Sequence, residues 1–150
     1  MQGDLLELDD VDAIVNAVNC VGVMGKGIAL QFKNRWPGNF TRYATACKAG
    51  EVRPGRMFVY DVGEPAKLRY IINFPTKAHW REASKIEFIR DGLVDLIAQI
   101  RHLKIRSIAI PSLGCGNGGL KWDEVRSSIE SAFRLSPDVD VCLFGPGGAP

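Results

Sequence analysis

The sequence has little of what several common classes of site require. It contains only two histidines and four cysteines in 150 residues. The cysteines form no Cys-x-x-Cys pair, so we expect free buried thiols of a reducing compartment and no zinc or other metal site. They are Cys20, Cys47, Cys115 and Cys142. The small net charge of +2 excludes a general nucleic-acid binder, so any nucleic-acid contact must come from a local patch.

Long apolar runs and targeting signals are also missing. No apolar stretch reaches the length that crosses a bilayer, and no basic-then-apolar segment opens the chain. Linkers, repeats and low-complexity segments are absent as well. We therefore expect one domain over residues 1–150 in the cytoplasm, without a membrane partner and as a monomer.

Several catalytic arrangements are excluded in the same way. The sequence has no Gly-Lys-Ser/Thr phosphate loop and no evident Ser-His-Asp arrangement. His102 is expected to be a charge at a helix C-terminus, whereas His79 is a candidate proton shuttle or substrate-orienting group. No pair of carboxylates falls in the loops described below, which argues against a two-carboxylate glycosidase.

Strand patterns alternate with helix patterns along the chain. The sequence predicts strands at 11–18, 55–62, 68–74, 107–111 and 139–144, and helices at 28–36, 39–48 and 122–134. The longest helix begins at a predicted capping box formed by Ser84 and Glu87 and continues to Leu103. Such alternation predicts an α/β domain of three layers, α/β/α, with a mixed, largely parallel central sheet.

Three loops follow predicted strands of that sheet, at residues 19–27, 75–84 and 112–120. Ligands of α/β sheets bind at the carboxyl ends of the strands. We therefore expect the three loops to meet at one cleft.

The loop at residues 112–120 contains four glycines within six positions: Gly114, Gly116, Gly118 and Gly119. A strand, a glycine-rich loop and a helix in succession place backbone N–H groups around a phosphate. A flexible connection between strand and helix is the alternative.

The loop at residues 19–27 has a second set of glycines that lead into a helix, whose N-terminus would attract an anion. Lys26 adds a charge there or is a solvated lysine. Asn16 and Asn19 precede the glycines and suit ribose hydroxyls, because asparagine both donates and accepts hydrogen bonds; alternatively they tie down a turn.

The loop at residues 75–84 contains the best catalytic candidate, Lys77. A lysine in a cleft near Arg81 would have a depressed pKa, and its neutral amine could attack an electrophilic carbon. Trp80 and Arg81 suit stacking and phosphate contact with single-stranded nucleic acid. The alternative is that Trp80 packs over the core while Lys77 and Arg81 are solvated.

Three motifs in this order resemble the macro domain family: GDL at residues 3–5, AIVNAVNCVGVMGKGIAL at 13–30 and IPSLGCGNGGL at 110–120. Members of that family bind ADP-ribose in a cleft at the top of an α/β/α sandwich. The resemblance implies that Asp4 meets the adenine amine, that Leu5 lies nearby and that Asn19 holds the distal ribose. It also implies that two loops wrap the diphosphate and the distal ribose, through Gly22, Val23, Met24, Gly25, Lys26 and Gly27, and through Ser112, Leu113, Gly114, Cys115, Gly116, Asn117, Gly118 and Gly119.

Residues 19–33 followed by FPTKAHWR at 74–81 resemble one branch of the family, the DarG-type DNA ADP-ribosyl glycohydrolases, and also terminal ADP-ribose protein glycohydrolase. The branch implies that Lys77 acts at C1″ of the distal ribose. It further implies removal of ADP-ribose from thymidine in single-stranded DNA, with His79, Trp80 and Arg81 as possible nucleic-acid contacts. A DarT-type toxin is the implied functional partner, and no cofactor is implied.

The sequence departs from the family pattern at Gly118, where the eukaryotic protein-directed relative carries an aspartate. This departure favours the DNA substrate and leaves the proton donor to substrate groups or His79. Since the GD motif follows only two residues and no further domain follows, we expect residues 1–150 to be an excised N-terminal catalytic module. Removal of ADP-ribose from protein glutamates and non-catalytic reading of ADP-ribose remain the alternative functions.

Overall fold

The computed structural model describes residues 5–8, 10–63 and 67–146. Its sheet has the strand order β2-β3-β1-β4-β5. The strands are β1 (Ala13–Val18), β2 (Phe58–Asp61), β3 (Tyr70–Pro75), β4 (Ser107–Ile110) and β5 (Asp140–Leu143). All neighbouring strands pair in parallel except β2, which is antiparallel to β3. The predicted mixed, largely parallel sheet is confirmed.

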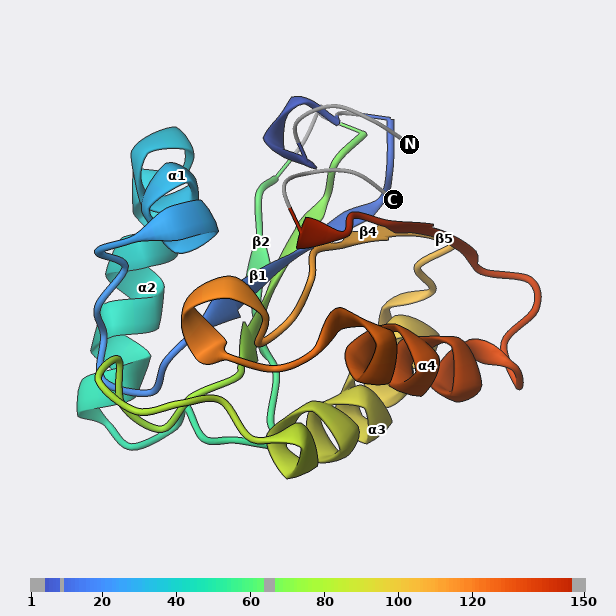
Figure 1. The fold of residues 1–150 in the computed structure, drawn as a ribbon. Helices are drawn as coiled ribbons and strands as arrows, with labels where there is room; N and C mark the ends of the chain where they lie inside the picture. Colours follow the sequence, from blue (N-terminus) through green and yellow to red (C-terminus); the bar gives the residue numbers. More distant parts are fainter. Residues whose placement is uncertain (1–4, 9, 64–66, 147–150) are drawn as a thin grey trace.

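Helices cover both faces of the sheet (Figure 1). They are α1 (Gly27–Arg35), α2 (Pro37–Lys48), α3 (Ile86–Leu103) and α4 (Trp122–Phe133). Because side chains alternate along a buried strand, β1 contributes to a core on each face. Ala13 and Val15 pack with α3 and α4, whereas Ile14 packs with Phe32 of α1. The three-layer α/β/α arrangement is therefore confirmed.

The start of α3 differs from the prediction. The capping box is wrong, because the N-cap residue is Lys85 and no side chain caps the helix. Ser84 instead donates its backbone N–H to the carbonyl of Gly118 over 3.0 Å. The pattern Ser-x-x-Glu is compatible with a cap, but in the structure Ser84 precedes the N-cap residue and is hydrogen-bonded to a distant loop.

Other boundaries differ from the prediction by a few residues. Pro37 opens α2 at its first turn, where its missing N–H and fixed φ are tolerated. Among the described residues, no helix is both long and apolar enough to cross a membrane.

Candidate functional site

A cavity of about 1140 Å³ lies at the carboxyl ends of β1, β3 and β4. Its lining combines the loops that follow these three strands with Leu5 and the segment 144–146. The volume is slightly above the range of about 300–1,000 Å³ that is usual for small-molecule sites. The structure thus brings the three predicted loops to one cleft with room for a ligand of dinucleotide size.

Asn19 organises the loop after β1. Its Oδ1 accepts hydrogen bonds from the backbone N–H of Val21 (3.0 Å) and Val23 (3.4 Å), and its Nδ2 donates to the carbonyl of Val23 over 2.8 Å. The hydroxyl of Tyr43 in α2 lies 2.7 Å from the same Oδ1. Burial raises the pKa of Tyr43 far above its ordinary value, so this hydroxyl remains a donor at neutral pH. Asn19 lines the cavity, yet most of its hydrogen-bonding capacity serves the loop.

Asn16 does not reach the cavity. It is fully buried, and its Nδ2 donates to Oδ1 of Asn73 in β3 over 3.1 Å. The amides of Asn73 and Asn39 in α2 are also hydrogen-bonded to each other. Neither interpretation describes Asn16, because its amide links β1 to β3 and does not tie down a turn or face a ligand.

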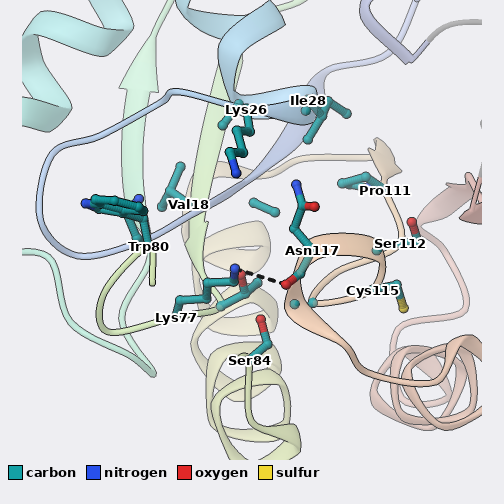
Figure 2. Close-up of a pocket in the computed structure, with 18 of the residues that line it drawn as sticks. Val18, Lys26, Ile28, Lys77, Trp80, Ser84, Pro111, Ser112, Cys115 and Asn117 are labelled. Atoms are coloured by element: carbon teal, nitrogen blue, oxygen red, sulfur yellow. Dashed lines mark hydrogen bonds between the residues drawn. The ribbon is translucent and has the colours of Figure 1, made fainter. Parts of the chain in front are cut away.

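The N-terminus of α1 faces the cavity through Lys26 and Gly27, both of which line it. Lys26 is the N-cap residue, and no side chain caps the helix. The side chain of Lys26 points into the cavity toward Asn117 (Figure 2). Uncapped N–H groups and an ammonium together create a positive end that suits a diphosphate.

The glycine-rich loop after β4 crosses the opposite side of the cavity. Gly114, Gly116 and Gly119 have φ values of +73°, +62° and +82°, a region that favours glycine. Gly118 has a different reason to be glycine, because a Cβ there would collide with the hydroxyl of Ser84. The loop therefore closes tightly against the start of α3.

The loop after β3 is joined to both of the other loops. The backbone N–H of Thr76 donates to Val18 over 2.8 Å, and Cys20 donates to the carbonyl of Ala78 over 3.3 Å. At its other end, the Ser84–Gly118 hydrogen bond joins it to the glycine-rich loop. These backbone hydrogen bonds fix the three loops relative to one another around the cavity.

Lys77 lies in the middle of this arrangement. Its Nζ donates to the carbonyl of Asn117 over 3.2 Å, so the amine is directed at the glycine-rich loop (Figure 2). The side chain is only partly buried and lines the cavity. A primary amine in this place can act as a nucleophile toward a bound electrophile when it is neutral.

The next turn presents an aromatic and cationic pair. Trp80 is 42% exposed, and the guanidinium carbon of Arg81 lies 4.6 Å from the centre of its ring. Both residues line the cavity, whereas His79 does not. Nδ1 of His79 accepts the backbone N–H of Arg81 over 3.1 Å, so this ring supports the turn.

The thiols near the site are poorly suited to nucleophilic chemistry. Burial, with a smaller contribution from Cys47, raises the pKa of Cys20 to about 11. Burial also raises the pKa of Cys115, which lines the cavity. Both thiols are therefore protonated at neutral pH, and the thiolate is the reactive form of cysteine.

Most of the predicted site residues described by the structure line the cavity. Exceptions besides His79 are Gly22, Met24, Leu113 and Gly119, of which Met24 and Leu113 are buried in hydrophobic clusters. Asp4 lies outside the described residues. Sequence reasoning missed Ser84, Ile28 and the segment 144–146, which also line the cavity. For the segment 144–146, the one signal in the sequence was that it follows a predicted strand of the sheet, whose carboxyl end could lie at the cleft.

Comparisons with known proteins agree with this geometry. The model of the family described as Macro domain matches residues 15–129. The DNA ADP-ribosyl glycohydrolase of Mycobacterium tuberculosis is 58% identical over 146 residues, which are 97% of this chain and 41% of that protein. The chain therefore spans about two fifths of the length of the first curated relatives that it matches.

Solved structures give the same result. The macrodomain of Mycobacterium tuberculosis DarG superposes with a TM-score of 0.94 at 57% identity, covering 97% of this chain and 95% of that one. Thermosipho africanus DarTG in complex with ADP-ribose superposes with a TM-score of 0.87 at 30% identity, covering 99% of this chain and 41% of that one. A sheet of this order, a cleft built from these three loops and a family match over residues 15–129 show that the chain belongs to the macro domain family.

Proposed function

We propose that this domain is a hydrolase that removes ADP-ribose from thymidine in single-stranded DNA. The observation on which the proposal depends is the amine of Lys77, held 3.2 Å from the carbonyl of Asn117 inside the cleft. The name and the 58% identity of the mycobacterial DNA ADP-ribosyl glycohydrolase support the same activity. We further propose a DNA ADP-ribosyl transferase, a DarT-type toxin, as the functional partner, and a cytoplasmic monomer as the working form.

ADP-ribose would lie across the cavity from Leu5 to Lys77. Leu5 is buried and lines the cavity, and we place the adenine beside it. The diphosphate would meet the N-terminus of α1 and Lys26 on one side and the glycine-rich loop on the other. This placement brings the distal ribose to Lys77 and leaves the base next to the modified thymidine near Trp80.

The reaction would proceed in two displacements at C1″. The neutral amine of Lys77 donates its electron pair to C1″, and the electron pair of the bond between C1″ and the thymine nitrogen leaves with the base, which takes up a proton. The amine loses a proton as the lysyl adduct forms. Water then adds to C1″, the bond between C1″ and Nζ breaks, and ADP-ribose leaves with the amine restored. The net change is hydrolysis of one glycosidic bond.

The test is a comparison of the wild type with Lys77→Ala on an oligonucleotide that carries ADP-ribosylated thymidine. We expect Lys77→Ala to bind ADP-ribose with little change and to lose release by about a thousandfold or more, because the nucleophile is gone. Lys121→Ala removes an exposed lysine outside the cavity and is the matched control. Full activity of Lys77→Ala would contradict the mechanism.

The same assay separates the two alternatives. If ADP-ribose is released only from modified glutamate peptides, the substrate is protein and not DNA. If nothing is released although calorimetry shows tight binding of ADP-ribose, the domain is a reader.

A further inference from the structure

The mechanism above leaves one buried polar group in the cavity without a role. Ser84 is only 6% exposed, and its Oγ has no hydrogen-bond partner among the described residues. A buried hydroxyl without a partner costs free energy, so native structures seldom keep one unless something binds it. Ser84 lines the cavity, and its hydroxyl is directed toward Lys77 and Asn117 (Figure 2).

Gly118 and Lys77 border the space around this hydroxyl. The backbone N–H of Ser84 donates to the carbonyl of Gly118, and a Cβ at Gly118 would collide with Oγ of Ser84. The same Cβ position lies 3.8 Å from Cε of Lys77, so the hydroxyl and the lysine side chain border the same small volume. Because Gly118 has no Cβ, there is room for the hydroxyl of Ser84 on the side of the cavity that faces Lys77.

We propose that the hydroxyl of Ser84 forms a hydrogen bond with the distal ribose of the bound nucleotide. This inference rests on the binding part of the proposed function, which places that ribose at Lys77, and not on the hydrolysis. Ribose hydroxyls both donate and accept, as a serine hydroxyl does, so the pairing satisfies Ser84 Oγ whichever group donates. The Lys77–Asn117 hydrogen bond lies next to the hydroxyl (Figure 2). A ribose that draws Nζ toward C1″ uncovers the hydroxyl for the same ring.

Calorimetry with two nucleotides tests the assignment without requiring turnover. ADP-ribose contains the distal ribose, whereas ADP ends at the diphosphate. For Ser84→Ala we expect the Kd of ADP-ribose to rise about five- to tenfold, as for loss of one hydrogen bond. The Kd of ADP should not change. The matched control is Ser136→Ala, since Ser136 is a serine of the same 6% exposure outside the cavity, and it should alter neither Kd.

Thermal unfolding gives a second readout that a purely structural serine would move. Because the hydroxyl has no protein partner among the described residues, Ser84→Ala should keep or raise the Tm while it weakens binding of ADP-ribose. A lower Tm with unchanged affinity for ADP-ribose would overturn the proposal, and so would equal losses for ADP-ribose and ADP. If the difference between the two nucleotides is found but the wild type releases nothing from modified DNA, the proposed function fails and the assignment of Ser84 stands. Failure of the wild type to bind ADP-ribose would overturn both.

Discussion

The oxygen of the Asn19 side chain is directed at its own loop more than at the cavity. Three donors surround it, from Val21, Val23 and Tyr43. One N–H of its amide is used by the carbonyl of Val23, so the second N–H is what remains for a ligand. Asn19 thus shapes the loop first, and any ribose contact comes from the remaining donor.

Tyr43→Phe tests this role of the loop. Its hydroxyl lies 2.8 Å from the carbonyl oxygen of Asn19 and 2.7 Å from Oδ1, and the side chain is fully buried. Removing it leaves buried acceptors short of a donor, so we expect a loss of about 1–2 kcal/mol in the free energy of unfolding. Affinity for ADP-ribose should fall severalfold because the loop is less well held.

Denaturant unfolding and calorimetry measure the two effects. Tyr60→Phe, which removes a tyrosine hydroxyl beside Gly38 and outside the cavity, is the control and should stay within about 0.5 kcal/mol of the wild type. A Tyr43→Phe variant as stable as the control would show that the hydroxyl does not hold the loop.

Individual residues were predictable to different degrees. The sequence placed Lys77 in a loop at the end of a strand, and the structure has it lining the cleft. The capping box at Ser84 was wrong because a local pattern says nothing of Gly118, which is 34 positions away and takes the backbone N–H of the serine. A long-range partner of this kind is invisible to spacing arguments.

Among the elements, α3 depends on a close approach to the sheet. Gly92 is buried in the middle of this helix, and a Cβ there would collide with the ring of Phe74 in β3. Cε of Met57 would also lie only 3.3 Å away. Glycine in a helix interior usually lowers stability, so its presence here reflects the packing and not the helix.

Gly92→Ala sets these two effects against each other. Helix propensity alone would stabilise the variant by about 1 kcal/mol. Overpacking against Phe74, which is fully buried, should cost about 1–3 kcal/mol or more. We expect the clash to outweigh propensity, so that denaturant unfolding shows a net loss.

Val94→Ala is the control within the same helix, since Val94 is 75% exposed and its truncation should change stability by less than about 0.5 kcal/mol. A Gly92→Ala variant more stable than the wild type would mean that α3 can shift away from the sheet.

The helices and strands themselves were largely predictable, because their hydrophobic periodicity is strong. In α3 the apolar spacing identifies the buried stripe that includes Ile89, Leu93 and Leu96. The sequence predicted strands at the positions of β2 and β3 but did not give their antiparallel pairing. Which face Gly92 occupies, and how closely it approaches Phe74, depends on the sheet and not on the helix pattern.

At the scale of the whole molecule, the cleft arises from the order of the strands. β1 lies between β3 and β4, so the loops after all three strands meet at the same edge of the sheet. The sequence predicted this meeting from parallel topology, but it could not supply the strand order or the contribution of residues 144–146 after β5. Those features depend on the pairing of distant segments.

The position of Trp80 at the rim of this cleft leads to the last prediction. Trp80 is 42% exposed and the guanidinium carbon of Arg81 lies 4.6 Å from the centre of its ring, so under the proposed function the ring would offer a platform for a base next to the modified thymidine. Stacking of one base on an aromatic ring contributes about 1–3 kcal/mol.

For Trp80→Ala we expect kcat/KM to fall about tenfold on an ADP-ribosylated oligonucleotide and to change little on ADP-ribosylated thymidine, which has no neighbouring base. Arg81→Ala should in addition make the slope of log K against log[salt] for oligonucleotide binding less steep, by the amount that corresponds to about one phosphate contact. Leu135→Ala, at a side chain that is 84% exposed and outside the cavity, controls for loss of apolar surface. Equal losses of Trp80→Ala on both substrates would mean that the ring serves the ADP-ribose cavity and not the DNA strand, because only the oligonucleotide has a base to stack on it.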